Sequence, residues 1–247
     1  ITIPENVESI GNNAFYNCSG LKKLNSEVDG EFNIPESVTT IENYTFYGCS
    51  QVVKITMGNI ETIGSYAFYN CSLVEYFNSE TQYKIEVPNT VISIGSYAFN
   101  GMALITEVYV PDSVESIGEG AFKGCNLIEK ITLPFVGQSE AATETKSVFG
   151  YIFGLYNPGN ETRSTSGTYM MSSTNEYINQ GYSFVYAYIS TKYTRHYGYY
   201  VPKTIREVTI TTQVNIPTNA FYNCDLIETI TIPENVESIG NNAFYNC

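Results

Sequence analysis

The sequence predicts a repeat solenoid that is interrupted by one long insertion. The segment ITIPENVESIGNNAFYNC occurs at residues 1–18 and again, unchanged, at residues 230–247. Between these ends, related copies follow the pattern P-x-x-V-x-x-I-G-x-x-A-F-x-x-C, and residues 134–200 depart from it. Because one copy is too short to bury its own apolar face, the copies are expected to stack on their neighbours.

The phenylalanine of the A-F pair marks the phase of the repeat. Its successive spacings are 31, 22, 31, 23, 99 and 23 residues, and the basic unit of 22–23 lies within the ~20–29 residues of leucine-rich repeats. The two spacings of 31 are interpreted as a coil with an added loop, NSEVDGEFN after Leu24 and NSETQYKIE after Phe77. The seven marker positions are Phe15, Phe46, Phe68, Phe99, Phe122, Phe221 and Phe244.

Each part of the unit predicts a local structure. The stretch after the cysteine alternates apolar and polar residues, as in Ile128, Ile131 and Leu133, which predicts a short strand with one buried side. A proline then ends the strand, because proline cannot donate to a ladder. A valine and an isoleucine three residues apart, as in Val114 and Ile117, predict a second buried ridge. The glycine after that ridge is expected to permit a turn.

The repeat pattern P-x-x-V-x-x-I-G-x-x-A-F-x-x-C-x-x-L resembles the treponemal-type, or BspA-like, leucine-rich repeat. The resemblance covers about two thirds of the chain and recurs seven times. It implies a curved, right-handed solenoid with a parallel β-sheet on the concave side and irregular or short helical segments outside. It also implies a surface or secreted protein that takes part in adhesion, and it brings no catalytic motif.

The insertion divides the chain into three expected segments: leucine-rich-repeat coils at 1–133, a tyrosine-rich island at 134–200 and resumed coils at 201–247. Half of the 22 tyrosines fall between residues 151 and 200, and an alternating aromatic run there predicts strands. Phe149 is expected near an A-F slot. The insertion leaves open whether the sheet continues from residue 133 to residue 207.

Composition argues against several classes of function. The net charge of −13 disfavours nucleic-acid binding, which needs a basic face. No apolar run approaches the ~18–20 residues of a spanning helix, so no membrane insertion is expected within this chain. His196 is the only histidine, and no activated nucleophile or glycine-rich phosphate loop accompanies it. We therefore expect no enzyme activity and no cofactor.

The cysteines share one slot of the repeat, which Met102 occupies in the fourth coil. Because the slot accepts methionine, its cysteines are expected to pack as small apolar side chains with free thiols. Disulfide formation between cysteines of neighbouring coils remains the alternative. The absence of a C-x-x-C pair argues against a metal site. The six positions are Cys18, Cys49, Cys71, Cys125, Cys224 and Cys247.

Two regions carry the candidate ligand-binding residues. The solvent-facing strand positions of a solenoid commonly bind ligands, and here they include Lys54, Tyr76, Glu107, Tyr109 and Lys130. Residues 134–206, the island and the six residues after it, carry a net charge of +2, and tyrosine and arginine are frequent in binding hot spots. Its candidates are Tyr186, Tyr188, Arg195 and Tyr197.

These features favour a non-enzymatic, extracellular adhesion module that binds a protein or glycan, with host and matrix molecules among the candidate ligands. The alternative is a structural unit of an extracellular fibre. The identical segments 229 residues apart suggest a larger tandem unit, and the near-perfect coils at both ends lack the polar caps of a closed solenoid. That alternative predicts self-association end to end.

Overall fold

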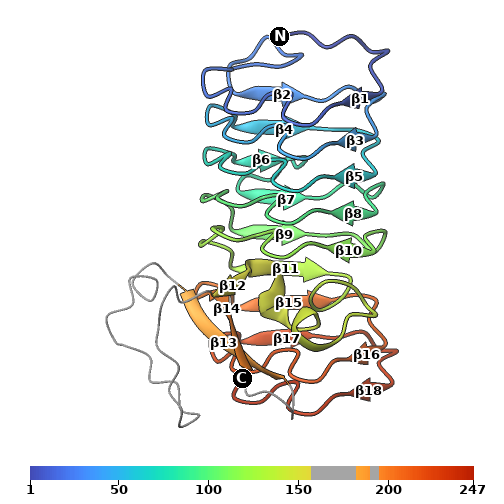
Figure 1. Ribbon diagram of the computed structural model, residues 1–247, viewed down its shortest axis with the longest axis vertical. Coiled ribbons are helices and arrows are strands. Elements are labelled where there is room, and N and C mark those ends of the chain that lie inside the picture. Colours follow the sequence, from blue (N-terminus) through green and yellow to red (C-terminus); the bar gives the residue numbers. More distant parts are fainter. Residues whose placement is uncertain (157–181, 190–194) are drawn as a thin grey trace.

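The computed structural model is a stack of β-coils whose strands form parallel sheets along the long axis (Figure 1). It describes residues 1–156, 182–189 and 195–247. For residues 155–156, 182–189 and 195–198 it describes only the backbone. The predicted repeat solenoid is confirmed.

The larger sheet contains eight strands in the order β17-β15-β11-β9-β7-β6-β4-β2. In seven of the eight strands a buried apolar residue points into the stack and its neighbours are more exposed, as the alternation predicted. In the last coil the corresponding Ile230 is half-buried. Phe77, Ile85 and Val108, for example, are fully buried. The strands are β2 (Glu31–Asn33), β4 (Lys54–Thr56), β6 (Tyr76–Phe77), β7 (Lys84–Glu86), β9 (Glu107–Tyr109), β11 (Lys130–Leu133), β15 (Glu207–Ile210) and β17 (Thr229–Thr231).

The predicted valine–isoleucine ridge forms a second file of short parallel strands beside the first (Figure 1). Its isoleucines are buried from Ile10 to Ile216, which confirms the ridge, whereas Ile239 of the last coil is 56% exposed. The sequence pattern did not indicate that the ridge pairs as a sheet. The five-stranded sheet contains β1 (Ser9–Ile10), β3 (Thr40–Ile41), β5 (Thr62–Ile63), β8 (Ser93–Ile94) and β10 (Ser116–Ile117), and β16 (Asn215–Ile216) pairs with β18 (Ser238–Ile239) further along.

The two added loops were misinterpreted. Each one returns to the larger sheet as a strand, β2 in the first and β7 in the second. Leu24 forms a parallel bridge with Phe32, and β6 pairs in parallel with β7. The 31-residue spacing therefore contains one full coil and one short coil of eight or nine residues, because Phe32 and Ile85 supply buried residues in phase with the stack.

The role of the repeat glycines also differs from the prediction. A Cβ on Gly95 would lie 2.3 Å from the backbone nitrogen of Ser65, and one on Gly118 would lie 2.2 Å from that of Ser96. These glycines let neighbouring coils approach closely. The left-handed backbone of the turn occurs two residues further on, at Tyr97 in the fourth coil.

The larger sheet continues across the insertion, because β11 pairs with β15 over all four residues. The segment after β11 first replaces a coil: the amide of Phe122 donates to Ile152, and that of Phe149 donates to Ala220, so Phe149 lies next to Phe221 in the A-F ladder as predicted. Two 3-10 helices, η1 (Glu144–Lys146) and η2 (Phe149–Phe153), precede a three-stranded sheet of β12 (Leu155–Tyr156), β13 (Tyr182–Ile189) and β14 (Arg195–Pro202).

Candidate ligand-binding surface

The candidate surface is the solvent side of the eight-stranded sheet. Its parallel register aligns one residue of every strand in a row that we call the sheet column: Glu31, Lys54, Tyr76, Lys84, Glu107, Lys130, Glu207 and Thr229. Tyr109 lies in the neighbouring row, between Glu86 and Thr132. The structure thus places all five candidates predicted in the solenoid on one face.

Charges of opposite sign meet along the sheet column. Lys84 Nζ lies 3.5 Å from the carboxylate of Glu86 and 3.3 Å from that of Glu107, and its side chain is only 19% exposed. Lys130 Nζ lies 3.5 Å from the carboxylate of Glu207. These lysines are therefore neutralised within the protein, and the surface does not select an anionic ligand by charge alone.

Lysine and tyrosine also meet on this face. Lys54 Nζ lies 3.3 Å from Glu80 and 6.0 Å from the ring centroid of Tyr76. Lys84 Nζ lies 5.9 Å from the ring centroid of Tyr109. Both distances suit a cation–π attraction, which restrains the long lysine side chains and holds the rings in place.

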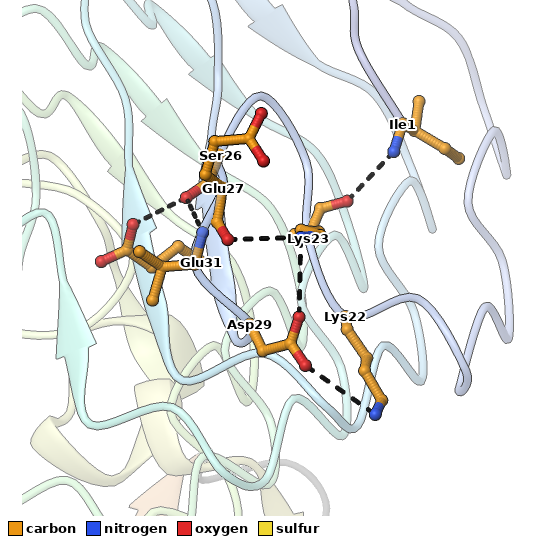
Figure 2. Close-up of polar contacts among 8 residues, drawn as sticks. Ile1, Lys22, Lys23, Ser26, Glu27, Asp29 and Glu31 are labelled. Carbon is orange, nitrogen blue, oxygen red and sulfur yellow. Dashed lines mark hydrogen bonds and ion pairs between the residues drawn. The ribbon is translucent and has the colours of Figure 1, made fainter.

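The short coil at residues 25–33 holds the first residue of the sheet column (Figure 2). Ser26 Oγ donates a hydrogen bond of 2.8 Å to the carboxylate of Glu31 and accepts one of 3.0 Å from the amide of Val28. Lys22 and Lys23 both reach the carboxylate of Asp29, at 3.8 and 3.9 Å. The carboxylate of Glu31 is thus oriented by its own short coil.

Several residues of the surface were missed because the short coils were taken for loops. Lys84 and Glu86 lie on β7, and Glu31 lies on β2. The signal was present in the sequence, since Ile85 and Val87 alternate with polar residues as in the other strands. Glu207 was missed because its register depends on pairing across the insertion.

The island candidates lie on the hairpin of β13 and β14. Tyr186 and Tyr188 belong to β13, whereas Arg195 and Tyr197 belong to β14. Tyr188 pairs with His196, and Arg195 pairs with Ile189. The side chains of these four candidates lie outside the described part of the structure, so their role stays a prediction.

All six cysteines are free thiols. Four of them pack into the stack as the repeat predicted, whereas Cys18 is half-buried and Cys247 is exposed in the first and last coils. Cys71 Sγ donates to the carbonyl of Phe46 at 3.3 Å, and Cys125 Sγ donates to that of Phe99 at 3.3 Å. Burial raises the pKa of Cys125 to about 12, which opposes the thiolate needed for nucleophilic or metal chemistry.

Within residues 1–156, 182–189 and 195–247, no group of three or more histidine, cysteine, aspartate or glutamate side chains is arranged to hold a metal ion. None of the helices described in these ranges is long and apolar enough to span a bilayer.

The stacked parallel strands and the recurring buried slots define the class of the protein as a leucine-rich-repeat solenoid. The chain belongs to the BspA-type leucine-rich-repeat family, whose model matches residues 1–30, 30–82, 75–150 and 171–247 in six copies. The sequence-based resemblance is thereby confirmed. Membership of this family favours a protein-binding repeat module over an enzyme.

The chain is similar to solved structures of leucine-rich-repeat proteins. A T. pallidum leucine-rich-repeat protein is 24% identical with a TM-score of 0.45, over 54% of this chain and 58% of that one. A leucine-rich cell surface protein of Faecalibacterium prausnitzii A2-165 is 22% identical with a TM-score of 0.45, over 100% of this chain and 57% of that one. The chain thus spans less than two thirds of each. The comparison with curated proteins finds no match.

Proposed function

We propose that the protein is a non-enzymatic, cell-surface or secreted adhesion module that recognises a protein ligand through the sheet column. One observation carries the proposal: parallel pairing aligns Lys54, Tyr76 and Lys84, and Tyr109 lies beside them. Tyrosine is enriched in binding hot spots, so two ordered tyrosines on one rigid face suit a binding surface. The lysines beside them contribute electrostatic complementarity to a partner.

The charge pattern favours a protein over a small anionic ligand. Each lysine of the sheet column has a carboxylate within 3.5 Å, so no uncompensated cation is left to select phosphate or sulfate. Alternating signs along a row instead specify the register of a partner with the complementary alternation. Membership of the BspA-type family supports both protein binding and an extracellular location.

A binding screen tests this function. Purified matrix proteins and a glycan array are probed with the full chain and with the triple variant Tyr76→Thr, Lys84→Thr and Tyr109→Thr. Threonine is chosen because Thr229 occupies the sheet column in the last coil and threonine suits strands. We expect at least one protein to bind, and the triple variant to bind it at least ten-fold more weakly.

A matched control carries the same kinds of exchange away from the sheet column, Lys22→Thr with Tyr222→Thr, and is expected to bind like the wild type. Loss of binding only in the triple variant supports the proposal. Binding of glycans alone, or no binding to any member of the screen, contradicts it.

A structural role in a fibre is the second candidate, and the identical segments at 1–18 and 230–247 favour it. Each segment stacks on its neighbour through the same residue, Phe15 on Phe46 at 5.2 Å and Phe244 on Phe221 at 5.5 Å. Coils of this sequence therefore suit stacking from either side. Light scattering of the chain tests this role: growth of particles with concentration supports it, and a monodisperse monomer contradicts it.

A further inference from the structure

Six tyrosines form two stacked columns on the turns that follow the five-stranded sheet, and we call them the tyrosine patch. In the first column the ring centroids of Tyr16 and Tyr47 are 4.7 Å apart, and those of Tyr47 and Tyr69 are 4.6 Å apart. The second column consists of Tyr44, Tyr66 and Tyr97, with centroids 4.7 and 5.0 Å apart. Within one coil the columns are close as well, since Tyr66 and Tyr69 are 5.6 Å apart.

The second column is formed against the preference of the backbone. Tyr44, Tyr66 and Tyr97 have φ values of 59°, 59° and 57°, a left-handed conformation that a bulky residue rarely adopts. Other coils place residues that tolerate this conformation at the same position: Asn13, Gly120, Asn219 and Asn242. Strain retained at three successive coils indicates that the tyrosines serve a purpose beyond the turn itself.

Ring stacking determines which groups of the tyrosine patch remain accessible to a ligand. Most ring faces are covered by the next ring of the column, with interplanar angles between 0° and 19°. A sugar stacks on an open aromatic face, so the columns are poorly suited to a glycan. What remains for a ligand is a row of ring edges and phenolic hydroxyls, which donate hydrogen bonds.

We infer that the tyrosine patch binds a proline-rich segment of a partner protein in the polyproline II conformation. Such a helix advances about 9.3 Å per turn of three residues, has free carbonyl acceptors and lacks internal hydrogen bonds. Two steps along the column of Tyr16, Tyr47 and Tyr69 cover about the same distance. The same side of the helix therefore meets the patch at every second coil.

Hydrogen bonding agrees with this ligand. Proline has no N–H, so a proline-rich segment offers mainly acceptors, and phenolic hydroxyls are matching donors. Burial raises the pKa of Tyr66, and burial beside Glu119 raises the pKa of Tyr97 to about 12, so both hydroxyls remain protonated at neutral pH. The Tyr97 hydroxyl already donates to Glu119, so the other hydroxyls of the patch are the donors for the ligand. Aromatic-lined grooves of other proteins also recognise polyproline II segments, and they exploit the preformed, low-entropy helix.

The charge of the protein selects the residues that flank the prolines. The net charge is −13, and Glu119 lies at the end of the second column, 3.5 Å from the hydroxyl of Tyr97. Arginine or lysine beside the prolines is therefore favoured, by long-range attraction as well as by contact with the acidic end.

The test uses the full chain and a synthetic peptide of ten prolines with two arginines at each end, by isothermal titration calorimetry. A peptide with glycines in place of the prolines keeps the charge and removes the preformed helix. We expect the proline peptide to bind at least ten-fold more tightly than the glycine peptide. We also expect Tyr44→Asn, Tyr66→Asn and Tyr97→Asn together to weaken binding at least ten-fold.

Asparagine is the residue that other coils hold at this position, so the triple variant is expected to fold, which circular dichroism checks. The control Tyr222→Asn with Tyr245→Asn alters the stacked pair of the last two coils, 5.0 Å apart, and is expected to bind normally. Equal binding of both peptides, unchanged binding by the triple variant, or a patch-dependent affinity for oligosaccharides or for a second copy of the chain would overturn the inference.

Discussion

The sheet column and the tyrosine patch are two solvent-facing surfaces of the same repeat, yet they are built by different means. Along the sheet column the residue type changes from strand to strand, and Lys84 is neutralised by its neighbours Glu86 and Glu107. In the tyrosine patch one residue type recurs and each ring stacks on the next. The buried positions of the repeat set a common spacing between coils. The solvent-facing positions vary, and they hold alternating charges on one surface and stacked aromatic rings on the other.

Both surfaces belong to coils whose core contains buried thiols, and high pH is expected to destabilise that core. Burial raises the pKa of Cys125 from 9.0 to about 12. The stabilising contribution is complete below pH 9 and is lost as the pH rises through 12, because the unfolded state loses its proton first. Three pKa units correspond to about 4 kcal/mol.

Chemical denaturation between pH 8 and pH 12 measures this loss. Met102 occupies the cysteine slot in the fourth coil, so Cys125→Met is the matched control. The difference in stability between wild type and variant should shift in favour of the variant as the pH rises. A difference that stays constant over this range would contradict the assignment to Cys125.

The second-largest effect on stability is expected on the turn side of the solenoid, where neighbouring coils approach each other closely. A Cβ at Gly95 would meet the backbone of Ser65 at 2.3 Å, whereas one at Gly11 has nothing within 4 Å. Gly95→Ala should cost about 3 kcal/mol, because backbone must move. Gly11→Ala should change the free energy of unfolding by less than about 0.5 kcal/mol. Equal effects in urea denaturation would refute close packing as the reason for Gly95.

The two columns of the tyrosine patch differ in backbone strain, which is present only in the second column. Tyr66→Asn removes stacking that stabilises the fold by about 0.5–1.5 kcal/mol. It also relieves the strain of a left-handed backbone, which costs about 1–3 kcal/mol. The net effect on the free energy of unfolding should therefore be near zero or stabilising. Tyr69 has no such strain to relieve, and Tyr69→Asn should cost about 1 kcal/mol. Thermal unfolding of the two variants compares them, and a larger loss for Tyr66→Asn would mean that the second column serves stability alone.

The smallest effect is expected on the sheet column. Lys84→Thr removes two ion pairs that are open to solvent on the glutamate side, so stability should fall by about 1 kcal/mol or less. Added salt should reduce the stability difference between wild type and variant, because it screens the ion pairs of Lys84. Denaturation at low and high salt measures both. A loss above about 3 kcal/mol would show that Lys84 is structural and unsuitable as a binding residue.

The sequence predicted the parts of the fold that recur with the repeat. Alternation at Ile128, Ile131 and Leu133 located β11, and the shared slot of Cys71 and Cys125 indicated packed thiols. These predictions succeeded because each depends on burial within one coil, and burial leaves a periodic trace in the sequence.

Features that depend on contacts between coils escaped prediction. The pairing of β11 with β15 joins residues on either side of the insertion, and no local pattern reveals that register. The short coil that ends in β7 lacks an A-F pair, so the alternation at Ile85 and Val87 was not recognised as a strand, and the pairing of Tyr76 with Lys84 shows where it belongs. The tyrosine patch was missed although Tyr44 and Tyr47 flank Phe46 in the same way that Tyr66 and Tyr69 flank Phe68. The boundaries at 133 and 200 remain a prediction.

The most direct test of the proposed function is hydroxyl-radical footprinting of the chain with and without the protein ligand selected by the screen. Tyrosine reacts readily, so Tyr76 and Tyr109 report on the sheet column, and Tyr222 and Tyr245 serve as internal controls. We expect oxidation of Tyr76 and Tyr109 to fall at least three-fold in the complex while the controls stay unchanged. Undiminished oxidation of Tyr76 and Tyr109 in a saturated complex would contradict binding on this face.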